Sequence, residues 1–291
     1  MQDSFSSLVA GFWRLQDWGM SDQALLAYIE ECLALGVTTM DHAMVYRSEA
    51  PFGKALALKP SLRDKMQIIT KFGIRPKGFG ALGAQSVNHY DSGPAALEES
   101  LNASLRDLQT DHVDVLLVHR PDYLMDVEAL AAAFDKWRAA GKVSYFGVSN
   151  FSTAQFEVLQ SACSEPLLTN QVEFSPYAME ALESGVFEQC QRHGARPMLW
   201  SCLAGGKLLA PQDEKGLRIV SALAEVKEEL GAESIEQVVY AWVRALPSRP
   251  LPLLGSSKIE RIRAAVSGLC LTLNREQWYR IWEASNGSAV P

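Results

Sequence analysis

Short apolar runs alternate with longer amphipathic runs along nearly the whole chain. A continuous apolar run between two helices is typical of a parallel strand whose sheet is covered on both faces. Eight such units in 291 residues favour a closed (β/α)₈ TIM barrel, an α/β fold, over the doubly wound open sheet that periodicity alone does not exclude. The expected strands are 7–12, 37–40, 67–70, 113–118, 143–148, 167–170, 197–200 and 251–254.

The amphipathic runs repeat their apolar side chains about every 3.6 residues, which is the period of an α-helix. The first helix is expected to open at Ser21 or Asp22 and to end at Gly36. No Pro/Gly/Ser-rich linker and no fixed-period repeat divides the chain, so a single barrel domain is expected over residues 1–291. The longest expected loop is 72–94. The other expected helices are 50–58, 95–108, 128–139, 153–162, 183–193, 216–230, 234–246 and one from Lys258.

Net charge, apolar runs and cysteine content indicate which partners and which cellular compartment are expected. The chain has 27 basic and 34 acidic side chains, and its net charge of −7 argues against nucleic acid or an anionic membrane as the main partner. No apolar run is long enough to span a membrane, and no signal-peptide pattern opens the sequence. The five cysteines lack Cys-x-x-Cys spacing, which favours reduced thiols in a cytoplasmic protein over disulfides or structural zinc.

Residues 78–83 spell G-x-G-x-x-G, the pattern of a dinucleotide-binding turn. That turn needs a strand directly before it and a helix that starts inside it, so that backbone amides meet the pyrophosphate. Here Arg75-Pro76-Lys77 precedes the glycines, and the residues that follow have the composition of a loop. We therefore interpret the segment as a flexible loop and not as a nucleotide site.

Polar side chains follow three of the expected strands at the ends where barrel enzymes place their chemistry. Asp41, Lys71 and His119 come directly after the second, third and fourth strands, and Tyr46 lies on the loop that Asp41 begins. Taken singly, each is better explained as a cap, a surface charge, a loop histidine or rim packing.

Together the four side chains form a chemical unit. A tyrosine hydroxyl has a pKa near 10, and a neighbouring ammonium such as Lys71 lowers that value. Asp41 would keep the lysine charged, and His119 would donate a hydrogen bond to a substrate carbonyl or tune the same proton. The set offers a tunable proton but no nucleophile and no metal cage, which suits proton transfer coupled to hydride addition at a carbonyl.

Five segments of the sequence resemble the aldo/keto reductase superfamily. Residues 40–56 resemble its D-x-A-x-x-Y-G-x-x-E-x-x-x-G-x-A-L stretch, and 69–71 resemble its strand-end lysine. Residues 113–122, 141–151 and 170–176 resemble its D-L-x-L-x-H-x-P-D, G-K-I-R-x-I-G-V-S-N-F and N-Q-V-E-Y-S-P segments. The matches run in the family's order over nearly the whole chain.

The resemblance implies a (β/α)₈ barrel that binds an extended nicotinamide dinucleotide without a Rossmann domain. It makes Tyr46 the general acid, Lys71 the partner that lowers its pKa, Asp41 the counter-ion of the lysine, and His119 the residue that orients the substrate. Ser149, Asn150 and Gln171 align with residues that hold the carboxamide, and Trp200 aligns with an aromatic residue that stacks on the nicotinamide ring.

A basic segment after the last expected strand resembles the family's 2′-phosphate site. Lys258, Arg261 and Arg263 stand there against one acid, and Ser257 with Glu260 forms a capping-box pattern that would start a helix at Lys258. NADP(H) is therefore expected over NAD(H). The full set of expected cofactor-binding residues is Ser149, Asn150, Gln171, Trp200, Ser201, Gly255, Ser256, Lys258 and Arg261.

Three functions remain in competition. The first is an NADP(H)-dependent reductase of small aldehydes or ketones, with Phe12 and Trp13 at the substrate mouth. The second is a redox-sensing or regulatory protein that binds the dinucleotide but turns over negligibly. The third is a barrel hydrolase or lyase that uses Asp41 and His119 without nicotinamide, and Ser149, Asn150, Gln171 and Trp200 count against it. A monomer or weak homo-oligomer without a metal is expected.

Overall fold

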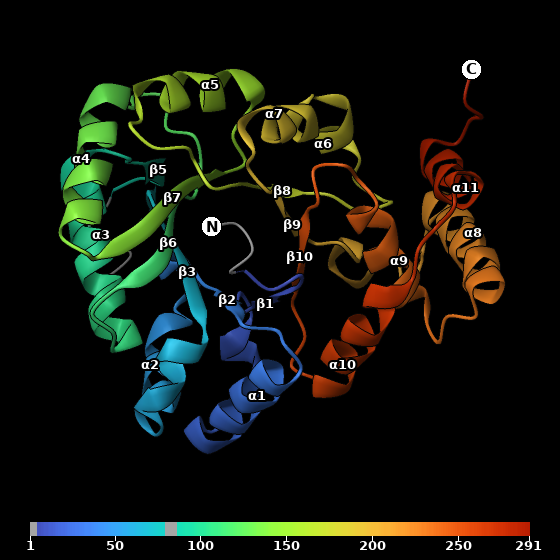
Figure 1. Cartoon of the computed structure of the whole chain (residues 1–291), viewed down its shortest axis with the longest axis horizontal. Helices are drawn as coiled ribbons and strands as arrows, with labels where there is room; N and C mark the ends of the chain where they lie inside the picture. The colour runs from blue at the N-terminus through green and yellow to red at the C-terminus, as the bar shows by residue number, and fades with distance from the viewer. Residues whose placement is uncertain (1–4, 79–85) are drawn as a thin grey trace.

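A computed structural model describes residues 5–78 and 86–291 of the chain. Its parallel strands close into a barrel in the order β1-β10-β9-β8-β7-β6-β3-β2, with helices around the outside (Figure 1). The expected (β/α)₈ fold is confirmed. The barrel strands are β1 (Val9–Gly11), β2 (Thr39–Asp41), β3 (Gln67–Phe72), β6 (Val113–Val118), β7 (Val143–Ser149), β8 (Asn170–Glu173), β9 (Met198–Trp200) and β10 (Leu251–Leu254).

Most helices fill the intervals between successive barrel strands, and α8 packs against α11 at one side of the barrel (Figure 1). No helix in the described part of the chain is both long and apolar enough to cross a membrane. The helices are α1 (Asp22–Ala34), α2 (Glu49–Ala57), α3 (Pro94–Leu108), α4 (Val127–Ala139), α5 (Thr153–Ala162), α6 (Glu180–Glu183), α7 (Val186–His193), α8 (Glu214–Leu230), α9 (Ile235–Arg244), α10 (Ile259–Ser267) and α11 (Arg275–Asn286).

The alternation of side chains along β3 explains how a lysine enters the barrel. Successive side chains of a strand point to opposite faces. Ile68 and Phe72 belong to the apolar layer that also includes the helices, whereas Ile69 belongs to a separate cluster with residues of β1, β6, β9 and β10. Lys71 lies two residues after Ile69 and shares its inward face. The barrel interior is therefore apolar at the level of Ile69 and polar near the carboxyl ends of the strands, where Lys71 lies.

Phe5 closes the apolar end of this interior. Its ring contacts Tyr145 edge-on with the ring centroids 6.1 Å apart, and it packs with the inner cluster around Val115 and Leu117. Apolar packing fills this part of the barrel and leaves the carboxyl ends of the strands as the place for polar chemistry.

Several expected boundaries were wrong for local reasons. β8 begins at Asn170 and not at Leu167, because Leu167 packs in the outer apolar layer before the strand starts. The helix expected over 183–193 begins only at Val186, as α7, because α6 ends at Glu183 and Gly185 between them has a left-handed φ of 78° that interrupts the helix.

The long loop and the C-terminus contain elements that the periodicity did not predict. A short antiparallel pair, β4 (Ile74–Arg75) and β5 (His89–Tyr90), lies within the expected loop 72–94. Of the G-x-G-x-x-G segment, only Gly78 lies within the described residues. Helix α11 follows the last barrel unit, and a capping box of Asn274 and Gln277 starts it.

Candidate active site

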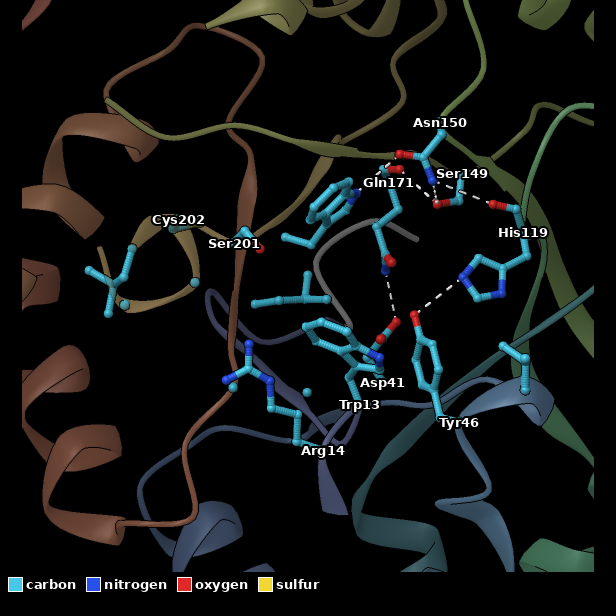
Figure 2. Close-up of a pocket in the computed structure, with 18 of the residues that line it drawn as sticks. Trp13, Arg14, Asp41, Tyr46, His119, Ser149, Asn150, Gln171, Ser201 and Cys202 are labelled. Carbon is cyan, nitrogen blue, oxygen red and sulfur yellow. Dashed lines mark hydrogen bonds between the residues drawn. The ribbon is translucent and has the colours of Figure 1, made fainter. Parts of the chain in front are cut away.

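A cavity of about 480 Å³ opens at the carboxyl ends of the barrel strands. Asp41, Tyr46 and His119 lie in its wall, and Lys71 lies beneath them, almost fully buried. Figure 2 shows Tyr46 and His119 on one side of the cavity and Ser201 and Cys202 on the other. The expected cofactor residues that also line it are Ser149, Asn150, Gln171, Trp200, Ser201, Gly255 and Arg261.

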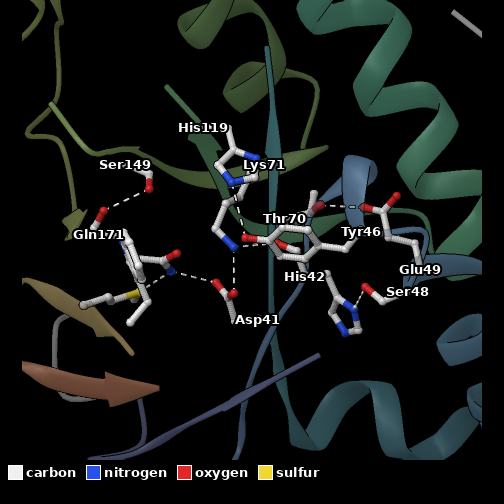
Figure 3. Close-up of polar contacts among 12 residues, drawn as sticks. Asp41, His42, Tyr46, Ser48, Glu49, Thr70, Lys71, His119, Ser149 and Gln171 are labelled. Carbon is white, nitrogen blue, oxygen red and sulfur yellow. Dashed lines mark hydrogen bonds and ion pairs between the residues drawn. The ribbon is translucent and has the colours of Figure 1, made fainter. Parts of the chain in front are cut away.

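Lys71 joins the strands that carry the site. Its Nζ donates to Asp41 Oδ1 at 2.6 Å and to the backbone oxygen of His42 at 2.7 Å, and it lies 4.9 Å from the centroid of the Tyr46 ring (Figure 3). Burial alone would lower the pKa of the Lys71 amine, but Asp41 and Tyr46 outweigh it and raise that pKa. The amine therefore stays charged at neutral pH.

Tyr46 ends a short 3₁₀ helix, Met44–Tyr46, that follows β2 and turns its ring toward the cavity. The phenol Oη lies 3.2 Å from His119 Nε2. Burial raises the pKa of Tyr46 above 10, and the positive charge of Lys71 opposes that rise without overcoming it. The sequence predicted the lowering effect of Lys71 but not the larger effect of burial, so the resting phenol is protonated.

His119 follows β6 and is uncharged at neutral pH. Burial, then the charges of Lys71 and Arg120, lower the pKa of its ring well below 6.5. A neutral imidazole carries one N–H donor and one acceptor nitrogen. The neutral phenol of Tyr46 and the neutral imidazole of His119 therefore face the cavity, and the charged amine of Lys71 lies beneath them.

A second polar group extends from the ends of β7 and β8 toward Trp200. Asn150 Nδ2 donates to Ser149 Oγ at 2.8 Å, and Trp200 Nε1 donates to Asn150 Oδ1 at 3.2 Å. Gln171 Nε2 donates to Asp41 Oδ2 at 2.8 Å, which ties this group to the Lys71 ion pair. Asn150 and Ser201 have the left-handed φ values of 60° and 55° directly after β7 and β9, where the chain turns at the cavity.

The basic segment expected at the phosphate site is only partly at the cavity. Arg261 lines it but is paired with Glu236 at the start of α9, and Arg263 is paired with Glu31 on α1. Two of the three cations therefore have carboxylate partners that lie far away in the sequence and that local composition could not reveal.

Ser256 and Lys258 do not line the cavity. Ser256 is turned into a local bend, where its Oγ accepts from the Lys258 backbone N–H at 3.1 Å. Lys258 is the N-cap of α10 without a side-chain cap, so the capping box of Ser257 and Glu260 was wrong and the helix begins at Ile259.

Phe12 does not face the substrate mouth. It is fully buried in the apolar layer and stacks on the His42 ring with the centroids 4.7 Å apart. Strand alternation explains this, because Gly11 lines the cavity and its neighbour points to the opposite face. Trp13 lies in the cavity wall and is 60% exposed, as a rim residue should be.

The structure also brings residues to the cavity that the sequence did not single out. Arg14 follows Trp13 and lies over its ring at 4.8 Å, and Arg120 follows His119. Tyr240 comes from the middle of α9 and Ile74 from β4. Arg14 and Arg120 could have been found from the sequence, because each directly follows a residue expected at the site. Tyr240 and Ile74 reach the cavity only through tertiary packing.

No group of three His, Cys, Asp or Glu side chains within residues 5–78 and 86–291 is arranged to hold a metal ion. Cys202 lies in the cavity wall, but it is buried and its Sγ donates to the Leu199 backbone oxygen. Burial raises the pKa of the Cys202 thiol to about 12, which leaves it unreactive at neutral pH.

Glu49, at the start of α2, is a buried acid next to the site, and it accepts from Thr70 Oγ1 at 2.5 Å (Figure 3). Burial raises its pKa to about 7 from an ordinary value of 4.5. The folded protein therefore holds this proton more tightly than the unfolded chain, and folding stability falls as the pH rises from about 4.5 to about 7, by about 3 kcal/mol from this group.

We expect Glu49→Gln to remove this part of the pH dependence, because glutamine imitates the protonated acid. Thermal unfolding followed between pH 4.5 and 8 should give a flatter curve for the variant, and the variant should gain most at pH 8. The exposed Glu183→Gln is the matched control and should follow the wild-type curve. Parallel curves for Glu49→Gln and wild type would contradict the assignment.

The fold and the site together define a barrel oxidoreductase whose catalytic candidates lie at the carboxyl ends of β2, β3 and β6. A model of the aldo/keto reductase family matches residues 7–286, and the chain belongs to that family. The family expected from the motifs is therefore confirmed.

Individual relatives agree with this assignment. Oxidoreductase YdhF of Escherichia coli (strain K12) is 50% identical over 99% of this chain and 96% of its own length. The 6-dehydroglucose reductase of Agrobacterium fabrum is 40% identical over 98% of this chain and 96% of its own. The structure of the glycerol dehydrogenase AKR11B4 from Gluconobacter oxydans has the same fold, with a TM-score of 0.82 at 24% identity over 96% of this chain and 91% of that chain.

Proposed function

We propose that the protein is an NADP(H)-dependent reductase that converts aldehydes or ketones to alcohols with Tyr46 as the proton donor. The observation that carries the proposal is the contact of Tyr46 Oη with His119 Nε2 at the cavity wall, directly above the Lys71–Asp41 ion pair. The aldo/keto reductase family supports the reaction class.

The cavity wall fits a nicotinamide dinucleotide. A Cβ atom added at Gly205, Gly206 or Gly255 would meet no atom within 4 Å, so there is open space beside these glycines along the cavity. The indole of Trp200 and the amides of Asn150 and Gln171 supply a flat surface and polar groups of the kind that hold a nicotinamide and its carboxamide. When bound, the dinucleotide supplies the hydride that reduces the carbonyl carbon.

Residues of the chain supply the proton that the reduced carbonyl oxygen receives. A carbonyl oxygen that approaches Tyr46 Oη and His119 Nε2 would accept hydrogen bonds that strengthen as negative charge develops on it. Tyr46 would then give its proton to that oxygen, since its raised pKa keeps the phenol protonated beforehand. Lys71 would stabilise the phenolate that is left, and Asp41 and Gln171 would hold the lysine and the carboxylate in place.

The experiment that tests this function is NADPH oxidation by the purified protein with a panel of aldehydes and ketones. Turnover with several carbonyls, and an alcohol product for each, would support the proposal. Tight binding of NADPH without oxidation by any carbonyl would favour the redox-sensing alternative. Failure to bind either NADPH or NADH, measured by quenching of tryptophan fluorescence, would reject both.

The choice of NADP(H) over NAD(H) rests on Arg261 at the cavity wall. A 2′-phosphate would compete with Glu236 for its guanidinium, and a charge-assisted bond of this kind is strong. We expect Arg261→Ala to raise the Kd for NADPH by about tenfold or more and the Kd for NADH much less. Arg263→Ala, which removes an arginine paired with Glu31 away from the cavity, is the matched control. Equal losses of both cofactors would reject the assignment.

A further inference from the structure

Arg120 is a half-buried cation in the cavity wall whose guanidinium has no protein acceptor within the described residues. Two carboxylates near the cavity have other partners: Asp41 binds Lys71 and Gln171, and Glu236 binds Arg261. A guanidinium carries five N–H donors, and those of Arg120 are open to an acceptor from outside the chain.

The position of Arg120 puts it beside the reacting pair. It is the next residue after His119, and its charge contributes to lowering the pKa of His119 and opposes the rise in the pKa of Tyr46. Glu173 is a carboxylate near Arg120 that forms no ion pair with it. Burial raises the pKa of Glu173, and the charges of Lys207 and Arg120 oppose that rise. Arg120 therefore lines the same cavity as Tyr46 and His119 and is close enough to act electrostatically on both.

Few other groups near the mouth of the cavity could bind a polar substituent of the substrate in place of Arg120. Arg14, the other cavity arginine without a carboxylate partner among the described residues, extends away from the Tyr46–His119 pair toward the side of Ser201 (Figure 2). The remaining surfaces near the mouth are mainly hydrocarbon or aromatic. They come from Trp13, Trp18, Val45, Ile74, Leu203 and Leu253.

We propose that Arg120 binds an oxygen acceptor of the substrate, so that the enzyme prefers aldehydes or ketones that carry a hydroxyl or carboxylate group close to the carbonyl. This inference rests on the proposed reductase function and adds a substrate class to it. Hydroxyls and carboxylates share the acceptor chemistry that a guanidinium recognises. A site that binds such an oxygen discriminates against an analogue that lacks it, because the donors are then left unpaired.

The test compares matched pairs of carbonyl compounds of similar length with NADPH in excess. Glyceraldehyde against propanal measures recognition of hydroxyls, and succinic semialdehyde against butanal measures recognition of a carboxylate. We expect wild type to favour the oxygenated member of at least one pair in kcat/KM. Arg120→Leu should lower kcat/KM for that member about 10- to 100-fold more than for its apolar partner, mostly through KM, and Arg120→Lys should recover part of the difference.

The controls separate this inference from the proposed function and from a general charge effect. Arg14→Leu removes a cavity cation on the other side and should change the ratio within a pair much less. Equal losses on both members of a pair in Arg120→Leu, no preference in wild type, or an equal shift in Arg14→Leu would each overturn the role of Arg120 while leaving carbonyl reduction intact. If wild type oxidises NADPH with no member of either pair and with no other carbonyl, both proposals fall. The pair that responds identifies which oxygen group is bound.

Discussion

Replacing Tyr46 by phenylalanine is expected to lower kcat for carbonyl reduction by about 10³-fold or more, which is within the range for loss of a general acid. The phenyl ring keeps the volume of the side chain above Lys71 and removes only the hydroxyl that lies 3.2 Å from His119 Nε2. The Kd for NADPH, measured by quenching of tryptophan fluorescence, should change little, because the groups assigned to the cofactor lie on or after β7, β8, β9 and β10 and not on the loop that carries Tyr46.

A second tyrosine in the cavity wall provides the matched control. Tyr240 is buried, and its hydroxyl makes no hydrogen bond to another described residue. Tyr240→Phe removes the same atom from the side of the cavity near Arg261 and should reduce kcat far less than Tyr46→Phe. If Tyr46→Phe keeps wild-type kcat, another group supplies the proton and the mechanism proposed for Tyr46 is wrong.

The barrel could be predicted from the sequence because its strands are apolar on both faces and separate the helices cleanly. β6 and β10 were placed with the correct bounds from their apolar runs alone. β8 was predicted to begin too early, because Leu167 and Leu168 are as apolar as a strand but lie before its first paired residue, Asn170. The β4–β5 pair has only two residues per strand, which is too short for a periodic pattern to appear.

The candidate catalytic group was predictable because parallel strands end at one edge of a barrel, so residues that end successive strands must meet there. The raised pKa of Tyr46 could not be predicted from the sequence, because it depends on how much protein covers the phenol. The pairing of Arg261 with Glu236 depends on helix packing between α9 and α10, and no local pattern encodes it. Phe12 was misplaced because the face of the three-residue strand β1 could not be fixed from its sequence.

Lys71→Met is the second change with a large expected effect, and it tests the ion pair that underlies the site. The Lys71 side chain is fully buried and Asp41 is 3% exposed, so removing the amine leaves a buried carboxylate with Gln171 as its remaining side-chain partner. Loss of one member of such a pair typically costs about 3–5 kcal/mol of unfolding free energy. Chemical denaturation should show this loss, and kcat should fall by about 10²-fold or more, because the phenolate of Tyr46 loses its stabilising cation.

The double variant Asp41→Asn/Lys71→Met separates the two consequences. Because the double variant has neither the lysine nor the carboxylate, no buried charge is left unpaired, and most of the lost stability should return while kcat stays low. A double variant as unstable as Lys71→Met would mean that the lysine contributes packing and not charge, and the electrostatic basis of the site would have to be abandoned.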